Sequence, residues 1–144
     1  MNGKSSKVYT AVDWGLLILR VGIGLMFIYH GYAKMFGGPH KWVEVGQAIG
    51  LLGITFAPLF WGFMCAFAEF FGGIFLSIGL ATRMYAFLLI INMLVAANMH
   101  LRMGQGVGAA SHAIEMGVVF VSLLIMGAGR LSLDAFFRSR LAAK

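Results

Sequence analysis

Four long apolar segments dominate this sequence, and each is long enough to cross a lipid bilayer as a helix. They cover residues of about 14–36, 57–80, 84–103 and 109–128. A helix rises about 1.5 Å per residue, so about 20 residues span a hydrocarbon core of about 30 Å. Because lipid offers no partner for backbone N–H and C=O groups, segments of this kind must be helical. The sequence therefore predicts an integral membrane protein in contact with a lipid bilayer.

The connections between these segments are short, and this limits how the helices can be arranged. Residues 81–83 join the second and third segments, and residues 104–108 join the third and fourth. Helices joined by loops this short pack as antiparallel neighbours. We expect an all-α, four-helix, up-and-down bundle that forms a single transmembrane domain over residues 1–144.

Two shorter amphipathic segments accompany the spans. Residues 39–53 carry Trp42 and Ile49 at helical spacing, with charged and amide side chains between them. After the last span, Ser132 is suited to cap a helix on which Phe136 and its apolar neighbours share the surface with arginines. We expect both segments to be short helices that lie at the membrane surface.

Positive charge is concentrated at the chain ends and in the connections, where it orients a membrane protein. The net charge is +6, yet only 11% of residues are charged, against about 25% in soluble domains. This distribution argues against nucleic acid as a partner. Cytoplasmic segments of membrane proteins carry an excess of Lys and Arg. The side of the membrane that holds both termini has seven of these residues and the opposite side has three, which predicts that both termini are cytoplasmic. The residues counted are Lys4, Lys7, Arg83, Arg130, Arg138, Arg140 and Lys144 on one side, and Lys34, Lys41 and Arg102 on the other.

The N-terminal residues superficially resemble a signal peptide, because Lys4 and Lys7 precede an apolar stretch. That stretch contains Arg20 and has no small-residue cleavage site, so we expect it to be retained.

Arg20 and Glu69 are charged residues inside predicted spans, where each costs about 2.5–3.5 kcal/mol unless it is paired or hydrated. Counted from the predicted helix ends, they lie close enough in depth to form a buried ion pair. Such a pair would fix the helix register. Alternatively, Glu69 carries a proton or binds a polar group of a ligand. Gly24 and Gly31 follow the same stripe as Arg20, which predicts close packing against a neighbouring helix.

A second set of titratable side chains comes together only when the bundle topology is drawn. Neutral imidazoles and a carboxylate are ligands for zinc, copper or iron. The same groups can instead hydrogen-bond a quinone carbonyl and exchange protons. A third interpretation is that they simply occupy the wet interface. The set, expected at the membrane face opposite the termini, is His30, His100, His112 and Glu115.

An ordered series of short motifs along nearly the whole chain resembles the DoxX family of small four-helix membrane proteins. This family is related to the DoxD subunit of thiosulfate:quinone oxidoreductase. The series is Leu19-Arg20, Gly24, His30-Gly31, Lys34-Met35-Phe36-Gly37, Glu69, Gly72-Gly73, Gly79-Leu80, Thr82-Arg83, Glu115 and residues 127–134.

The resemblance implies a bacterial or archaeal protein of the cytoplasmic membrane that is linked to redox chemistry, sometimes as one subunit of an oxidoreductase. The positions that match the family pattern are Arg20, His30, Lys34, Glu69, Arg83 and Glu115. His100 and His112 lie outside that pattern.

These observations lead to a quinone-linked membrane redox component as the first hypothesis for function. Glu69, His30 and Arg20 are its candidate catalytic residues, and Lys34 and Glu115 join them as candidate quinone-binding residues. A partner subunit or a second copy of the chain is expected, together with a quinone or a small reductant. The alternative is a non-enzymatic membrane subunit or scaffold that docks redox enzymes on its basic ends.

Overall fold

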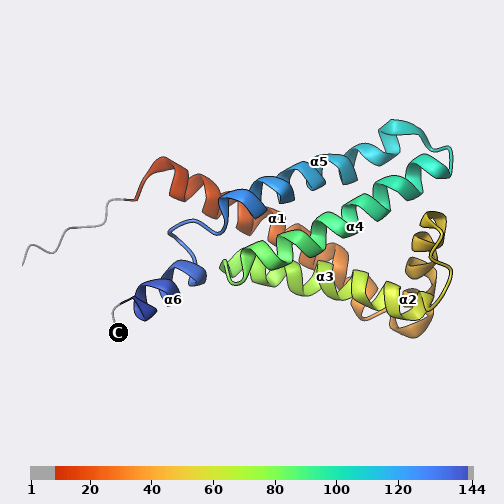
Figure 1. Ribbon diagram of the computed structural model, residues 1–144, viewed down its shortest axis with the longest axis horizontal. Coiled ribbons are helices and arrows are strands. Elements are labelled where there is room, and N and C mark those ends of the chain that lie inside the picture. Colours follow the sequence, from red (N-terminus) through yellow and green to blue (C-terminus); the bar gives the residue numbers. More distant parts are fainter. Residues whose placement is uncertain (1–8, 143–144) are drawn as a thin grey trace, which may run out of the picture.

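Four long antiparallel helices form the body of the protein in the computed structural model, which describes residues 9–142 (Figure 1). Each is long and apolar enough to cross a membrane, so the predicted all-α bundle of four spans is confirmed and the chain is a multi-pass membrane protein. The predicted retention of the N-terminal segment, and Lys4, Lys7 and Lys144, fall outside the described residues. The four helices are α1 (Ala11–Met35), α3 (Pro58–Ile78), α4 (Thr82–Arg102) and α5 (Gly106–Met126).

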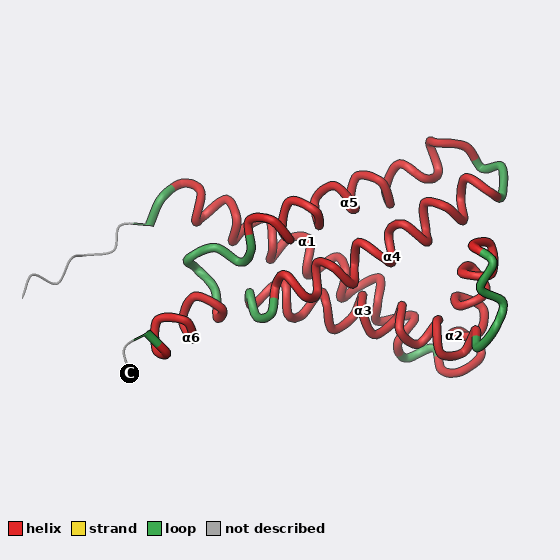
Figure 2. The backbone as a smooth tube through the Cα atoms, viewed as in Figure 1, coloured by secondary structure: helices red, strands yellow, loops and turns green. Residues whose placement is uncertain are grey.

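Short helices cover the two ends of this bundle, as the sequence predicted. We call the end that holds residue 9, the α3–α4 turn and α6 (Leu133–Leu141) the terminal end (Figure 1). The opposite end, here the α2 end, carries α2 (Gly38–Gly46) and the 3₁₀ helix η1 (Gln47–Leu52). Figure 2 shows that only short loops join these elements. The one predicted segment of residues 39–53 is therefore divided into an α-helical and a 3₁₀ part.

Local sequence explains where several helices begin and end. Thr10 and Asp13 form a capping box at the start of α1, in which the Thr10 backbone N–H donates to the Asp13 carboxylate at 2.9 Å. Ser132 caps α6 as predicted, accepting from the Ala135 backbone N–H at 3.2 Å. The C-terminus of α3 is closed by Gly79, whose φ of +69° is readily adopted only by glycine.

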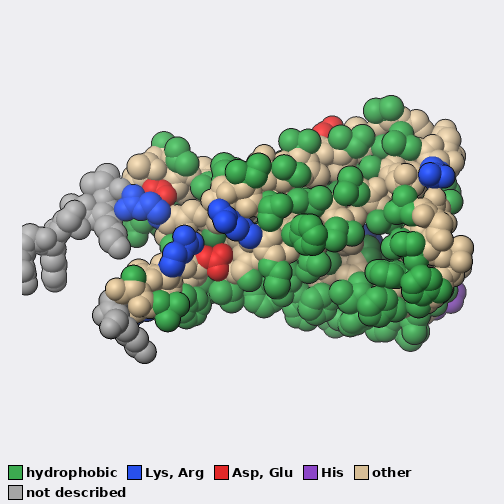
Figure 3. Space-filling view, viewed as in Figure 1, with side chains coloured by type: hydrophobic (Ala, Val, Ile, Leu, Met, Phe, Trp, Pro, Cys, Tyr) green, Lys and Arg blue, Asp and Glu red, His purple; other side chains and the backbone are tan. Residues whose placement is uncertain are grey.

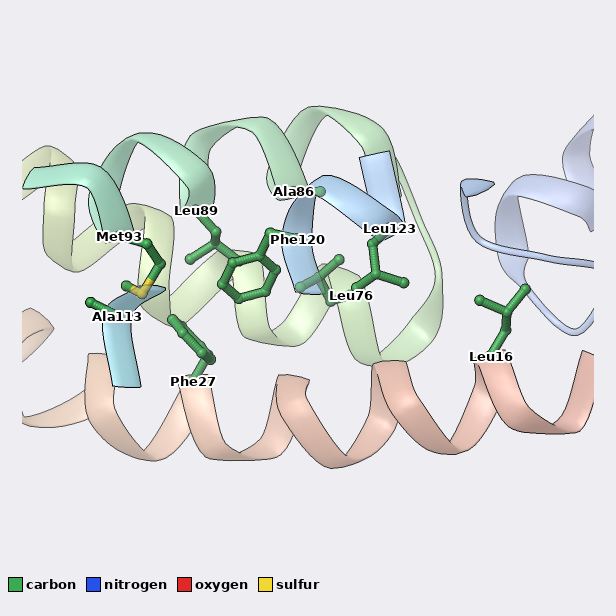
Figure 4. Close-up of a cluster of buried hydrophobic side chains, with 9 residues drawn as sticks. All are labelled: Leu16, Phe27, Leu76, Ala86, Leu89, Met93, Ala113, Phe120 and Leu123. Atoms are coloured by element: carbon green, nitrogen blue, oxygen red, sulfur yellow. The ribbon is translucent and has the colours of Figure 1, made fainter. Parts of the chain in front are cut away.

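The buried core is small and lies where the four long helices meet (Figure 4). Phe27 of α1 and Phe120 of α5 pack edge to face at its centre, with ring centroids 4.9 Å apart. Most other apolar side chains cover the outside of the bundle (Figure 3), as expected for helices whose solvent is lipid. The core residues are Leu16, Phe27, Leu76, Ala86, Leu89, Met93, Ala113, Phe120 and Leu123.

Glycines bring α1 and α3 into backbone contact, and this contact sets the register between them. A Cβ added to Gly24 would lie 2.6 Å from the Gly73 carbonyl oxygen, and one added to Gly31 would lie 2.7 Å from the Phe70 Cα. Such distances are closer than real Cβ atoms come to backbone. The predicted packing role of these glycines is therefore confirmed, and Gly31 lies level with Glu69 and Phe70.

Candidate functional site

Arg20 lies fully buried at the terminal end and donates hydrogen bonds to backbone carbonyls. Its Nη1 donates to the Leu76 oxygen at 3.0 Å, and its Nη2 donates to the Leu131 oxygen at 2.6 Å. Leu76 belongs to the last turn of α3, where carbonyls lack helical partners and the helix dipole favours a cation. Arg20 thus joins the C-terminus of α3 to the segment that leads into α6.

The predicted ion pair between Arg20 and Glu69 is wrong, and the helix register explains why. Glu69 lies level with Gly31, which is eleven residues beyond Arg20 on α1. At about 1.5 Å per residue the two positions are about 16 Å apart along the helix, farther than an arginine side chain reaches. Depths counted from predicted helix ends placed the residues too close together.

Asp134 completes the terminal end, in a role that the sequence analysis missed. Its carboxylate accepts hydrogen bonds from the backbone N–H groups of Ala81 at 2.8 Å and Thr82 at 3.1 Å. It therefore caps the N-terminus of α4 from a distant part of the chain. Capping signals are sought beside the helix that they cap, so the sequence around α4 gave no indication of this residue.

The ion-pair partner of Glu69 is Lys34, in the last turn of α1. The Lys34 Nζ lies 2.6 Å from both carboxylate oxygens. The Glu69 side chain is only 5% exposed, whereas that of Lys34 is 30% exposed, so the pair has one buried and one accessible member. Trp42 of α2 donates from its indole Nε1 to the Lys34 carbonyl oxygen at 2.9 Å, which holds this end of α1 in place.

The Lys34–Glu69 pair lines a cavity of about 670 Å³ at the α2 end, between α3, α4 and the α2–η1 segment. Cys65 donates from its thiol to Glu69 Oε1 at 3.8 Å, and Asn92 Nδ2 donates to the Cys65 carbonyl oxygen at 3.1 Å. Trp61 also lines the cavity, and its buried indole Nε1 has no hydrogen-bond partner within residues 9–142.

The remaining wall of this cavity is mostly apolar, with Glu44 and Gln47 as its other polar residues. A mostly apolar cavity with a few polar groups on one wall suits a flat or elongated apolar molecule that carries a polar head. The ammonium offers a donor to such a head, and the carboxylate offers an acceptor. The apolar residues include Val45, Ile49, Phe60, Met64, Leu88, Ile91, Val95 and Met99.

The four predicted metal ligands do not converge as expected. The rings of His30 and His112 are neighbours, with centroids 6.2 Å apart, but both side chains are exposed. His100 instead hydrogen-bonds Gln105, with 2.6 Å between Nδ1 and Oε1. Across residues 9–142, no group of three or more His, Cys, Asp or Glu side chains is arranged to hold a metal ion.

The predicted ligands do not converge because the face of α5 that carries two of them points away from the bundle. His112 and Glu115 share a face as predicted, but that face points outward, while Ala113 and Phe120 face the core. None of the four predicted ligands lines the cavity beside Lys34.

Comparison with known proteins identifies the family. The DoxX family model matches residues 15–102, a range that contains Arg20, the Lys34–Glu69 pair and most of the cavity wall. The chain belongs to the DoxX family. This DoxX protein is also similar to "Putative oxidoreductase CatD" of Bacillus subtilis (strain 168), with 30% identity over 122 residues, or 85% of this chain and 86% of that protein. No solved structure matches the chain.

Proposed function

We propose that this DoxX protein is a quinone-linked redox component of the prokaryotic cytoplasmic membrane, and that the head group of a quinone binds in the α2-end cavity. The single observation that carries the proposal is an ion pair, Lys34–Glu69, on the wall of a mostly apolar cavity at the α2 end. A volume of about 670 Å³ lies within the range of about 300–1,000 Å³ that small-molecule sites occupy. The name of the relative from Bacillus subtilis, "Putative oxidoreductase CatD", agrees with this assignment.

Lys34 is the residue best placed to bind a quinone carbonyl oxygen. Its ammonium group has three N–H donors, and Glu69 accepts from it through both carboxylate oxygens, so one donor is left for a ligand. Trp61 lines the same cavity, and its buried, unpartnered indole N–H would be a second donor once a bound ligand shifts this side chain. A polar ligand atom there would satisfy a buried group that otherwise costs free energy.

Reduction of a bound quinone takes up two electrons and two protons. Lys34 holds a proton at Nζ that it can donate to the carbonyl oxygen, and Glu69 stabilises the charged ammonium until that transfer. The accessible side of Lys34 allows the proton to be replaced from water. The electrons come from a small reductant, or from a partner subunit that oxidises one.

Of the residues first predicted for the site, Lys34 and Glu69 remain in this proposal. Arg20 is occupied with backbone carbonyls at the other end of the bundle. His30 and Glu115 lie exposed and outside the cavity wall. Trp61 is the addition that the structure suggests.

Tryptophan fluorescence tests the proposal directly, because bound quinones quench nearby indoles. The chain has three tryptophans, of which Trp61 lines the cavity and Trp14 lies near the start of α1, toward the opposite end. A short-chain benzoquinone or naphthoquinone added to the detergent-solubilised protein should quench saturably. Trp61→Phe should remove most of the saturable part, and Trp14→Phe should leave it unchanged. Purely linear quenching, equal in both variants, would contradict a quinone site in this cavity.

The basic terminal end favours a second candidate function, a scaffold that docks soluble redox enzymes. Arg83, Arg130, Arg138 and Arg140 are all exposed there, and basic side chains gather at this end in Figure 3. A scaffold should retain a co-purifying partner when Lys34 and Glu69 are both replaced, and lose it when these arginines are. Under the quinone proposal, quinone binding should be lost when Lys34 and Glu69 are replaced and kept when these arginines are replaced.

A further inference from the structure

A second cavity, of about 620 Å³, lies at the terminal end, where the C-terminus of α5 and the first turn of α4 face α6. Its wall carries three arginines, Arg83, Arg130 and Arg138, and two aspartates, Asp13 and Asp134. Nothing in the proposed quinone chemistry uses this cavity. Its charged groups therefore need a separate explanation.

Both aspartates already have partners for their oxygens, and the three arginines of the wall outnumber them by one. Asp134 accepts from two backbone N–H groups at the positive N-terminus of α4. Asp13 accepts from the Thr10 backbone and hydroxyl, each at 2.9 Å, and lies 3.6 Å from Arg130 Nη1.

Arg83 and Arg138 are the two arginines of the wall that are best placed to bind an anion. Arg83 donates from Nη2 to the Ile125 carbonyl oxygen at 3.0 Å, a neutral acceptor, so its other N–H groups can serve a ligand. The exposed guanidinium of Arg138 has no ion pair or side-chain hydrogen bond within the described part of the chain. An anion in the cavity would meet both groups.

The helix α6 has two different faces, and this difference indicates what kind of anion fits. Toward the cavity it presents Asp134, Ala135, Arg138, Ser139 and Ala142, whose small members leave the space unfilled. The opposite face is apolar except for Arg140, and its side chains are between 37% and 75% exposed where the structure gives them. That face consists of Leu133, Phe136, Phe137, Arg140 and Leu141.

An apolar surface leads away from the cavity along the spans. Met126 lines the cavity and is 49% exposed, and Ile125 beside it is 71% exposed. Met84 and Phe87, on the first turns of α4, are 54% and 53% exposed. A ligand held in the cavity by an anionic group can therefore lay apolar chains against α4 and α5.

We propose that the terminal-end cavity binds the phosphate of an anionic phospholipid between Arg83 and Arg138, with its acyl chains against α4 and α5. Planar guanidinium groups match phosphate oxygens in two-point hydrogen bonds. Basic pockets between membrane helices at the cytoplasmic surface are suited to anionic head groups. The bound lipid would tie α6 to the ends of α4 and α5.

Native mass spectrometry of the full-length protein in detergent tests this site by counting bound lipids as phosphatidylglycerol is added. Phosphatidylglycerol should bind more tightly than phosphatidylcholine. Arg138→Gln should weaken its binding about fivefold, and Arg83→Gln with Arg138→Gln about 25-fold, at about fivefold per arginine. Arg140→Gln is the matched control, because it removes the same charge from the opposite face of the same helix and should leave binding unchanged.

Three results would overturn the proposal. The first is equal binding of phosphatidylcholine, and the second is a loss in Arg140→Gln as large as that in Arg138→Gln. The third is displacement of phosphatidylglycerol by millimolar inorganic phosphate, which would identify a site for soluble anions instead. If the double variant fails to fold, Arg138→Gln decides the question alone, because this exposed side chain makes no ion pair or side-chain hydrogen bond within residues 9–142.

Discussion

The two ends of the bundle each hold a charged side chain of α1 against α3, but they satisfy that charge in different ways. At the terminal end, fully buried Arg20 donates to backbone carbonyls, and Asp134 accepts from backbone N–H groups. At the α2 end, Lys34 and Glu69 satisfy each other through side chains, on the wall of a cavity. The contrast separates two uses of charge within one membrane protein.

The type of partner determines whether a buried charge can take part in chemistry. Backbone groups at helix ends cannot leave a charged side chain unless the helices themselves move apart. A side-chain partner beside a cavity can exchange one of its hydrogen bonds for a ligand while the fold stays intact. A charged residue inside a span is therefore a candidate functional residue, and the identity of its partner decides whether its role is structural or functional.

The largest expected effect is that of Arg20→Met, which tests whether the terminal end is structural. The carbonyls of Leu76 and Leu131 lose a charged donor, at a cost of about 3–5 kcal/mol in the free energy of unfolding. Thermal unfolding in detergent, followed by size-exclusion chromatography, measures the loss. Whatever protein remains folded should bind quinone as tightly as the unchanged chain. A variant with normal stability and weakened quinone binding would reverse the assignment of the two ends.

Lys34→Met should give the next largest loss of stability, because it leaves the carboxylate of Glu69 buried without a partner. We expect about 2–3 kcal/mol, less than for a fully buried pair because the Lys34 side chain is 30% exposed. Adding Glu69→Gln to Lys34→Met should restore part of the stability, since the uncompensated charge is gone. Unfolding of both single variants and the double variant forms a double-mutant cycle. Quinone binding should be lost in the two variants that lack Lys34, and strictly additive losses of stability would contradict a coupled pair.

The sequence was sufficient to predict most of the fold, because the fold depends on the lengths of the apolar runs and of the loops between them, which are local properties of the chain. An apolar run of sufficient length specifies a span whatever its neighbours are, and short loops then specify antiparallel order. The Ser132 cap and the two faces of α6 were equally visible, since both depend on residues close together in the chain. The division between α2 and η1 was not predicted, because apolar spacing alone does not distinguish the two helix types.

The candidate site was only partly predictable, because it depends on the register between helices. Arg20 and Lys34 lie on the same stripe of α1, and apolar patterning does not say which of them meets Glu69. The contact between Gly31 and the backbone of α3 decides in favour of Lys34. Trp61 and Cys65 are residue types common in apolar cores, so nothing in the sequence marks them as part of a cavity wall.

Asp134→Ala should have a smaller effect, confined to the terminal end. Loss of the cap on α4 costs about 1 kcal/mol, as for other helix caps. Asp134→Asn keeps the side-chain oxygen and should cost less. Denaturant unfolding of the two variants measures the difference, and quinone binding should be unaffected in both. A stability loss that is equal for alanine and asparagine would show that the charge, and not the capping bond, is what matters.

Trp61→Phe should have the smallest effect on stability and still alter the proposed site. The indole N–H has no partner within residues 9–142, and the aromatic ring that packs against Phe60, with centroids 5.1 Å apart, is largely kept by phenylalanine. Removing an unsatisfied buried donor should leave the free energy of unfolding within about 0.5 kcal/mol of its starting value, or raise it. The rise in unfolding temperature that a bound quinone gives should nevertheless decrease, because the ligand loses one donor. Thermal unfolding with and without a short-chain quinone measures both quantities on the same sample. A marked loss of stability without quinone would mean that the indole N–H does have a partner, and the α2 end would then resemble the terminal end, with its polar groups committed to the fold.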